Sequence, residues 1–483
     1  MNWRYLISPI LLAVLLLTGC ATNPVTGEQD FVMVSEDQEI AQGREYHQTI
    51  IAQYGVYDNP ELQAYVDKIG QNLAAQSHRA HLDFHFTVLD TPDINAFALP
   101  GGYVYITRGI MAYLDSDAEL AGVLGHEIGH VTARHSVRQQ SGQLASGLLN
   151  VLIAATTGSD TLSQLGNQLS TGLIRGYGRK HELEADRLGA QYLHRTGYNP
   201  EIMLEVIGVL KDQELYEIAK AKEENRPANI YHGVYSTHPE NDDRLQTVIF
   251  AAKDLSVQDY RDNNKAGYLG LIDGMTWGQS PEQGVIIKNR FMHAQLGIAL
   301  QFPADWKIDN RADALFARNP ANSALLQVRL VGLQENESLG ALLKRITKNS
   351  ALSVEQQNYG STARSRATVS ANQQPARVSA IKLDKNQALF IAGTSTEADF
   401  KLTDPQLLAI NRSFVRLSAK QISDIKTPQV EIITATSADS FASIAKQSAI
   451  DDDAEDILRL LNGAFPDGKI TTRQKLKTIS FSD

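Results

Sequence analysis

Residues 116–135 read Ser-Asp-Ala-Glu-Leu-Ala-Gly-Val-Leu-Gly-His-Glu-Ile-Gly-His-Val-Thr-Ala-Arg-His, and this stretch predicts the helix around which the fold is built. Ser116 and Glu119 have the spacing of a capping box, in which the two side chains satisfy backbone N–H groups at the start of a helix. The apolar run 120–125 follows directly and indicates that the helix is buried rather than solvated. The polar residues that come next therefore need buried partners.

His126, Glu127 and His130 are those polar residues, and their spacing predicts a catalytic metal site. A helix places residues four apart on one face, so both imidazoles can bind one metal ion. Zinc accepts such donors in a tetrahedron and, when catalytic, keeps one position for water. The metal lowers the pKa of that water from about 15.7 toward ~7, and Glu127 can accept its proton and pass it to a leaving amine. The alternative is a helix with two surface histidines, which the apolar surroundings disfavour.

A third ligand is expected from the helical segment His181-Glu182-Leu183-Glu184-Ala185-Asp186. Glu182 and Asp186 are four apart and share a face, so Glu182 can bind the metal while Asp186 hydrogen-bonds the outer nitrogen of a ligand histidine. Spacing alone leaves Glu184 open as the ligand. Lys180 and His181 are expected to be solvated and receive no role.

Two motifs, HEIGHVTARH (126–135) and ELEADRLGAQYL (182–193), resemble the HtpX/BepA/Oma-type family of HExxH zinc peptidases, metallopeptidase family forty-eight, a gluzincin family. The resemblance covers about residues 30–255. It implies a zinc metalloendopeptidase that holds one Zn²⁺ per chain, with Glu182 as the third ligand. Asp186 corresponds to the family's aspartate that supports a ligand histidine.

Two further segments match the family. Asn95-Ala96-Phe97-Ala98, followed by Leu99 and Pro100-Gly101-Gly102, resembles its edge strand, along which a substrate backbone can pair as an added strand. Ser236-Thr237-His238-Pro239 resembles its THP segment. His238 could bind the metal as a fourth ligand that blocks the water, stabilise an oxyanion, or simply order a loop, and the sequence leaves these three open.

The N-terminus predicts export. Arg4 precedes an apolar stretch from Leu6 to Leu17, which is too short to span a ~30 Å hydrocarbon core and reads as a signal peptide over residues 1–19. Leu17-Thr18-Gly19-Cys20 resembles a bacterial lipobox, with Cys20 as the lipidated residue. The alternative is a plain signal peptide with a fortuitous cysteine. Ala21 after the cysteine is typical of sorting to the outer membrane, so we expect a lipid-anchored protein on the periplasmic side of the envelope.

Cys20 is the only cysteine, which excludes an intramolecular disulfide. The formal net charge of -10, from 45 Lys and Arg against 55 Asp and Glu, argues against nucleic acid as a partner.

The length of 483 residues predicts a multi-domain chain. We expect a tether over 20–34 and then a mainly α, zincin-type peptidase domain with a small β-sheet over 35–260. Within it, residues 137–176 predict a mobile, partly amphipathic segment. An α+β domain is expected over 285–418, with a weak resemblance to the PsbP/Mog type, and a small LysM-like α/β unit over 428–483.

The function expected from these features is hydrolysis of peptide bonds in misfolded or misassembled envelope proteins. The resemblance to LysM modules implies peptidoglycan binding, whereas a degenerate copy that binds only protein is the alternative. Two alternatives therefore stay open: a largely latent, chaperone-like lipoprotein and a peptidoglycan-binding envelope lipoprotein. The repeats that carry partner recognition in BepA-like members are absent from this sequence, so that recognition is not carried over.

Overall fold

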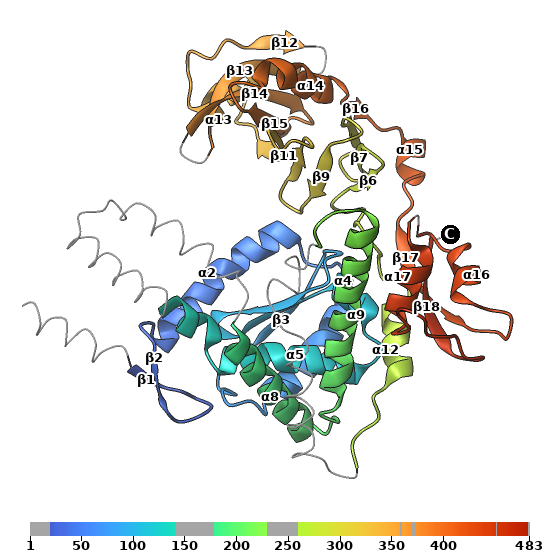
Figure 1. The fold of residues 1–483 in the computed structure, drawn as a ribbon. Helices are drawn as coiled ribbons and strands as arrows, with labels where there is room; N and C mark the ends of the chain where they lie inside the picture. The colour runs from blue at the N-terminus through green and yellow to red at the C-terminus, as the bar shows by residue number, and fades with distance from the viewer. Residues whose placement is uncertain are drawn as a thin grey trace, which may run out of the picture. The chain divides into compact units, whose positions relative to one another are not determined.

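The computed structural model describes residues 20–141, 178–228, 259–357, 360–369, 372–450 and 452–481. The chain divides into two compact units, and Figure 1 labels their elements. The first unit draws on Met1–Thr49, Val56–Trp277 and Pro428–Phe481, and the second on Ile50–Gly55 and Gly278–Thr427. The expected signal peptide, most of the expected mobile segment 137–176 and His238 lie outside the described residues.

The first unit is mainly helical, as the sequence predicts. Its longer helices are α2 (Glu36–Tyr54), α3 (Pro60–Ala74), α5 (Asp117–Thr132), α8 (Arg179–Arg195) and α9 (Ile202–Glu223), and its shorter ones are α4 (Arg108–Tyr113) and α12 (Lys265–Ile272). Among the described residues, none of the helices combines the length and the apolar character needed to cross a bilayer. Helix α3 is an example of an amphipathic helix in this unit. Its apolar face packs against the core, where Leu62, Val66, Ile69 and Leu73 are buried at helical spacing.

A three-stranded sheet lies in the same unit, with the order β3-β5-β4. Its strands are β3 (His85–Leu89), β4 (Ala96–Leu99) and β5 (Tyr103–Thr107), with β3 parallel and β4 antiparallel to β5. The turn η1 (Pro100–Gly102) joins β4 to β5. Gly101 and Gly102 have φ of 79° and 98°, and a Cβ on Gly101 would lie 2.7 Å from the Cα of Ile40, so glycine is required here.

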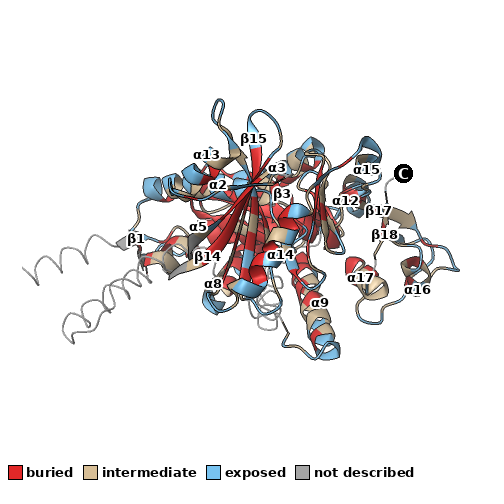
Figure 2. Ribbon diagram, turned by 90° about the horizontal axis from the view of Figure 1, so that it is seen from above, coloured by how far each residue is buried: buried red, intermediate tan, exposed pale blue. Residues whose placement is uncertain are grey.

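The helix α5 lies at the centre of this unit. Every residue from Asp117 to Thr132 is buried, and Figure 2 distinguishes such buried segments from the exposed faces of outer helices such as α9. Ser116 caps its start by accepting a hydrogen bond from the backbone N–H of Glu119, at 3.2 Å. The Glu119 carboxylate in turn accepts from the backbone N–H of Asp115, at 2.9 Å. Ser116 is therefore the N-cap and the helix is buried, as predicted, but the Glu119 carboxylate bonds to the N–H of Asp115 and not to that of Ser116, as a capping box would require.

The C-terminal segment Pro428–Phe481 belongs to the first compact unit. Its elements are β17 (Pro428–Thr434), α16 (Phe441–Ala445), α17 (Ala454–Leu461) and β18 (Lys475–Phe481). Their buried side chains join the same apolar cluster as α3, α5 and α9. Residues 273–277 run along β17, with Val430 N donating to Met275 O at 2.8 Å and Trp277 N donating to Pro428 O at 2.7 Å. Shared apolar burial and shared backbone hydrogen bonds thus make this segment part of the first unit.

A short hairpin lies within residues 20–34, the stretch expected to be a tether. Strand β1 (Cys20–Thr22) pairs antiparallel with β2 (Gln29–Phe31). The turn between them is held by Asn23, whose side-chain oxygen accepts hydrogen bonds from the backbone N–H groups of Val25 and Thr26.

The second unit is rich in β-strands. A seven-stranded antiparallel sheet has the order β12-β13-β14-β15-β11-β10-β9, and a four-stranded one has the order β16-β8-β7-β6. The strands are β6 (Val285–Ile287), β7 (Arg290–His293), β8 (Ile298–Gln301), β9 (Lys307–Asn310), β10 (Leu315–Arg318), β11 (Ala324–Gly332), β12 (Glu355–Gln357), β13 (Gly360–Val369), β14 (Asn372–Lys382), β15 (Gln387–Ser395) and β16 (Val415–Arg416). The helices are α13 (Leu339–Thr347), α14 (Phe400–Arg412) and α15 (Ala419–Ser423). The chain is thus a helical N-terminal region with a small sheet, followed by a region of several antiparallel sheets.

Candidate metal centre

The candidate metal centre lies where helices α5 and α8 cross at close range. Small residues line the crossing of α5 and α8: a Cβ on Gly129 would lie 2.9 Å from Ala185 O, and a Cβ on Gly189 would lie 3.1 Å from His126 N. Because no side chain separates the two backbones there, polar residues on the facing sides of the helices come within bonding distance. This crossing explains why residues more than fifty positions apart meet.

Three side chains converge at the crossing. His126 and His130 of α5 and Glu182 of α8 each offer a donor atom, and these atoms all lie within 4.8 Å of one another. The two Nε2 atoms are 3.0 Å apart, and the Glu182 carboxylate lies 3.6 Å from His126 Nε2 and 3.4 Å from His130 Nε2. The three residues are 5%, 2% and 0% exposed.

This donor set fits zinc. Two imidazole nitrogens and one carboxylate oxygen match the donors that zinc prefers at catalytic sites. Burying a carboxylate costs several kcal/mol unless a cation compensates it, and a divalent ion between these atoms would do so. Among the described residues, this is the group that could hold a metal ion.

Asp186 supports one of the two histidines directly. Its carboxylate lies 2.7 Å from His126 Nδ1 and is fully buried. A proton on Nδ1, next to this carboxylate, would leave the Nε2 lone pair for a metal, so the contact favours that tautomer of His126. The spacing of Glu182 and Asp186 on one face of α8 produces this arrangement.

The second histidine is supported differently, through a residue that the sequence reasoning missed. His135 Nδ1 lies 2.8 Å from His130 Nδ1, and His135 Nε2 lies 3.1 Å from Glu184 Oε2. Glu184 therefore faces His135 and not the metal position, which leaves Glu182 as the acid of α8 beside the two ligand histidines. Arg138 NH1 also donates to Glu184, at 3.1 Å.

The pKa values around His135 follow from this burial. Desolvation alone would raise the pKa of Glu184, but the hydrogen bonds from His135 and Arg138 lower it to about 2. Desolvation lowers the pKa of His135, against the opposing effect of Glu184. His181, expected to be solvated, stacks on His135 with ring centroids 4.3 Å apart, and burial lowers its pKa to about 4.

Glu127, the expected catalytic base, follows His126 on α5 and is 2% exposed.

The expected edge strand is β4, which lies at one end of the described three-stranded sheet and contains Ala96, Phe97 and Ala98. Asn95 precedes this strand, and its backbone N–H donates a hydrogen bond to the Thr107 hydroxyl. A small cavity lies beside this strand and is also lined by His130. It is lined by Glu39, Ala98, Leu99, Pro100, His130, Val131, Arg134, Ser136 and Val137.

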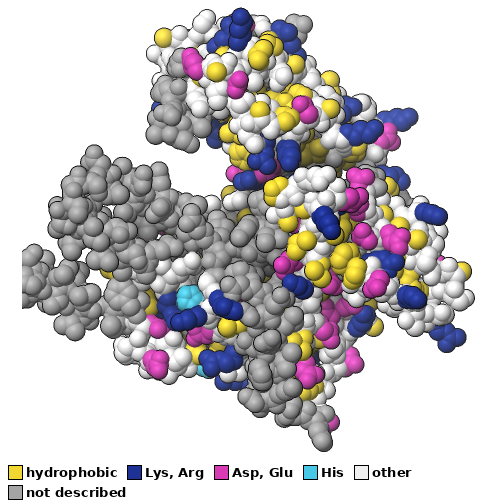
Figure 3. Space-filling view, in the orientation of Figure 1, with side chains coloured by type: hydrophobic (Ala, Val, Ile, Leu, Met, Phe, Trp, Pro, Cys, Tyr) yellow, Lys and Arg dark blue, Asp and Glu magenta, His cyan; other side chains and the backbone are white. Residues whose placement is uncertain are grey.

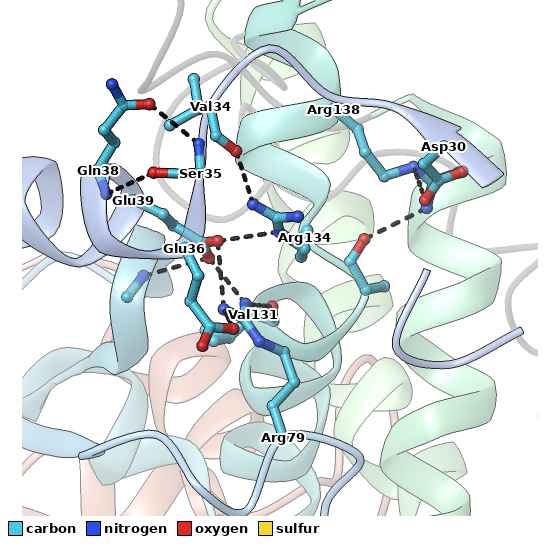
Figure 4. A network of polar contacts seen from close by, with 12 residues as sticks. Asp30, Val34, Ser35, Glu36, Gln38, Glu39, Arg79, Val131, Arg134 and Arg138 are labelled. Atoms are coloured by element: carbon cyan, nitrogen blue, oxygen red, sulfur yellow. Dashed lines mark hydrogen bonds and ion pairs between the residues drawn. The ribbon is translucent and has the colours of Figure 1, made fainter. Parts of the chain in front are cut away.

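A network of ion pairs and hydrogen bonds lies at the C-terminal end of α5 (Figure 4). Arg79 NH1 donates to Glu39 at 2.8 Å and to the carbonyl of Val131 at 3.0 Å. Arg134, whose φ is 55°, donates from Nε to the same Glu39 at 2.9 Å. Glu39 and Arg79 are 1% and 0% exposed. Paired charges of this kind tie α2 to the end of the helix that carries the histidines.

The fold and this centre define a class, the metallopeptidases that hold their metal by two histidines of one helix and an acid of a second. The family model described as Peptidase family M48 matches residues 60–249, which contain the whole site. Over these residues, the chain is similar to this family of zinc metalloendopeptidases.

Similar proteins include three with curated names. The beta-barrel assembly-enhancing protease of Yersinia pestis is 29% identical over 70% of this chain and 74% of its own length. The protein of the same name from Escherichia coli (strain K12) is 32% identical over 46% of each chain, so the similarity spans about half of that relative. The mitochondrial metalloendopeptidase OMA1 of Arabidopsis thaliana is 33% identical over 30% of each chain.

Among solved structures, cyanobacterial PsbP from Synechocystis aligns with 28% of this chain and 95% of its own. The identity is 14% and the TM-score is 0.22, a likeness that carries no argument about the fold.

Proposed function

We propose that this protein is a zinc-dependent endopeptidase that hydrolyses peptide bonds in misfolded or misassembled proteins of the bacterial envelope. The observation that supports it most is the meeting of His126, His130 and Glu182 beside Glu127 in a buried helix crossing. A bound zinc ion would polarise the scissile carbonyl and lower the pKa of the attacking water.

The side chains of the site have separate proposed roles in metal binding and in proton transfer. His126, His130 and Glu182 would hold the metal, and Asp186 would keep His126 in the tautomer that binds it. Glu127 accepts the proton of the attacking water and transfers it to the leaving nitrogen of the cleaved bond. Burial of these groups excludes competing water and strengthens the electrostatic interactions between them.

The substrate is proposed to bind as an extended strand along β4, through the backbone of Asn95, Ala96, Phe97 and Ala98. In support, Ala98 and Leu99 of this strand line a small cavity that His130 also lines. Strand addition needs an extended, accessible backbone, which a folded substrate seldom offers. This favours unfolded segments as substrates.

His238 is proposed to act near the centre, as a fourth ligand or as an oxyanion stabiliser, and it lies outside the described residues. The activity of a His238→Ala variant distinguishes the fourth ligand from the oxyanion stabiliser. Activity of His238→Ala above wild type indicates a blocking ligand, and loss of activity indicates a catalytic one.

The proposed setting is the periplasmic side of the envelope, with Cys20 lipidated and the protein held at the outer membrane. The apolar leader and the lipobox-like Leu17-Thr18-Gly19-Cys20 support this. The names of the Yersinia and Escherichia relatives support envelope proteins as substrates. On the face drawn in Figure 3, acidic and basic side chains of described residues are interspersed, which together with the charge of -10 disfavours nucleic acid.

Peptidoglycan is a second candidate ligand. The order β17-α16-α17-β18, with the two strands antiparallel, agrees with the proposed LysM-like unit over 428–483. The PsbP/Mog-like character of 285–418 is likewise a proposal. Sedimentation of the full chain with purified peptidoglycan tests glycan binding, and failure to co-sediment at any protein concentration removes this candidate.

The experiment that tests the main proposal compares wild type with Glu127→Gln on unfolded casein, with both proteins loaded with zinc. Glu127→Gln keeps the shape of the side chain and removes the base, so cleavage is expected to fall by ~10²-fold or more. Equal cleavage by the two proteins overturns the mechanism. If Glu127→Gln fails to cleave and yet supports growth of a deletion strain under envelope stress, the chaperone-like alternative replaces the proposal.

A further inference from the structure

The two histidines at the metal centre are supported unequally. His126 Nδ1 meets the Asp186 carboxylate directly, at 2.7 Å. His130 Nδ1 meets another imidazole nitrogen, His135 Nδ1, at 2.8 Å. A neutral imidazole in that position is a weaker and more selective partner than a carboxylate, because it accepts a hydrogen bond only in one of its two tautomers.

The tautomers of this pair follow from the contacts at both ends. If His130 Nε2 holds a metal, the proton of its neutral ring is on Nδ1, and His135 Nδ1 must accept it. The proton of His135 is then on Nε2, where Glu184 Oε2 lies 3.1 Å away and can accept it. The opposite tautomer of His135 would bring two N–H groups face to face and direct a lone pair at a carboxylate.

We propose that His135 and Glu184 form a positioning relay that holds His130 in its metal-binding tautomer and orientation. This inference rests on the proposed zinc site and adds residues that the metal centre itself does not include. Both residues are proposed to act through His130 rather than on the metal or the substrate directly.

The surroundings keep His135 in place. The side chain is 0% exposed, and the ring of His181 stacks against it. Beyond Glu184, Arg138 NH1 donates to the same Oε2, and Arg138 Nε lies 3.3 Å from Asp30 of β2. Figure 4 shows Arg138 and Asp30 directed toward each other. The relay is therefore anchored at its outer end by an ion pair to the N-terminal hairpin.

The test uses two nearly isosteric substitutions at one position. In His135→Asn the side-chain oxygen can take the place of Nδ1 as the acceptor for His130, whereas His135→Leu has a similar volume and offers no acceptor. Zinc dissociation constants of the full chain, measured by competition with a chromophoric chelator, are expected to rise 10–100-fold for His135→Leu and by about threefold or less for His135→Asn.

A second pair covers the case in which His135→Leu fails to fold. Glu184→Gln retains an acceptor for His135 Nε2–H, and Glu184→Leu removes it, so only Glu184→Leu is expected to weaken zinc binding by about tenfold. Thermal unfolding of the zinc-free proteins provides the folding control, and the compared variants should unfold at similar temperatures.

The outcomes separate this inference from the proposed function. Wild type that binds no zinc and cleaves no casein contradicts the proposed function, whatever the variants do. Wild type that binds zinc and cleaves, together with His135→Leu and His135→Asn of equal zinc affinity, overturns the relay alone.

Discussion

Lys477 Nζ lies 2.8 Å from Asp115 Oδ1, and the Lys477 side chain is 1% exposed. The same ammonium group donates a hydrogen bond to the carbonyl of Leu114, at 2.9 Å. Lys477 belongs to β18 near the C-terminus, whereas Asp115 stands just before α5, the helix of the metal centre. Burial would raise the pKa of Asp115, but the charges of Lys477 and Lys265 lower it. Strand β18 thus holds the start of the active-site helix by a partly buried ion pair.

Replacing Lys477 tests the strength of that contact. Lys477→Met keeps the length of the side chain and leaves Asp115 with Lys265 as its remaining partner, so we expect a loss of about 2 kcal/mol in the free energy of unfolding. Urea unfolding of the full chain measures it. Lys475→Met, at an exposed position of the same strand, is the control and should change stability by less than about 0.5 kcal/mol. Equal effects of the two substitutions would contradict the role given to Lys477.

Removing the C-terminal segment should unfold the peptidase region rather than delete a separate module. A chain that ends at Thr427 loses β17, α16, α17 and β18, whose buried side chains belong to the same apolar cluster as α5 and α9. We expect faster hydrogen exchange in α4 and α9 and a loss of cooperative thermal unfolding. A truncated chain that melts at the wild-type temperature would refute this.

The helix crossing makes a prediction about glycines. A Cβ on Gly129 would lie 2.9 Å from the backbone oxygen of Ala185, so Gly129→Ala must push α8 away from α5 and move Glu182 from the histidines. Zinc affinity should fall by at least about tenfold. A Cβ on Gly125 would meet its nearest atom, in Gly189, at an ordinary 3.5 Å, so Gly125→Ala is the matched control. It should bind zinc normally and gain up to about 1 kcal/mol in stability from helix propensity. Normal zinc affinity in Gly129→Ala would show that the spacing of the two helices does not limit the site.

The carboxyl group of Glu119 makes the free energy of unfolding depend on pH. Burial, and next the charge of Asp115, raise its pKa from 4.5 to about 7. The folded chain therefore keeps a proton that the unfolded chain has released, and stability falls as the pH rises from about 4.5 to about 7. Glu119→Gln retains the capping hydrogen bonds and has no such proton.

Urea unfolding of zinc-free wild type and Glu119→Gln at pH 5 and pH 8 measures this effect. Relative to wild type, the variant should gain about 2 kcal/mol across the interval. A difference between the two proteins that does not change with pH would contradict the raised pKa.

Much of this architecture is readable from local sequence. The capping box at Ser116, the glycine turn at 100–102 and the helical spacing of 179–196 all depend on neighbouring residues, and each prediction is close to the observed element. The grouping of His126, His130 and Glu182 follows from helical periodicity and from the family resemblance.

The features that sequence reasoning missed depend on contacts between distant segments. His135 is five residues from His130, a spacing that predicts no shared helical face, and it contacts His130 because α5 ends and Arg134 adopts a positive φ. The inclusion of 428–481 in the first unit depends on burial against α4, α9 and α12, which local patterns do not encode. One signal was available for the crossing: Gly125, Gly129 and Gly189 on two helices indicate close backbone approach.

The central claim is that Glu182 completes the metal site with His126 and His130. Its most direct test is the zinc content of the purified full chain after dialysis against metal-free buffer, for wild type and for Glu182→Gln. We predict one zinc per chain in wild type and less than about a tenth of that in Glu182→Gln, because the neutral amide is a poor zinc ligand. A Glu182→Gln protein that retains a full equivalent of zinc would contradict the account.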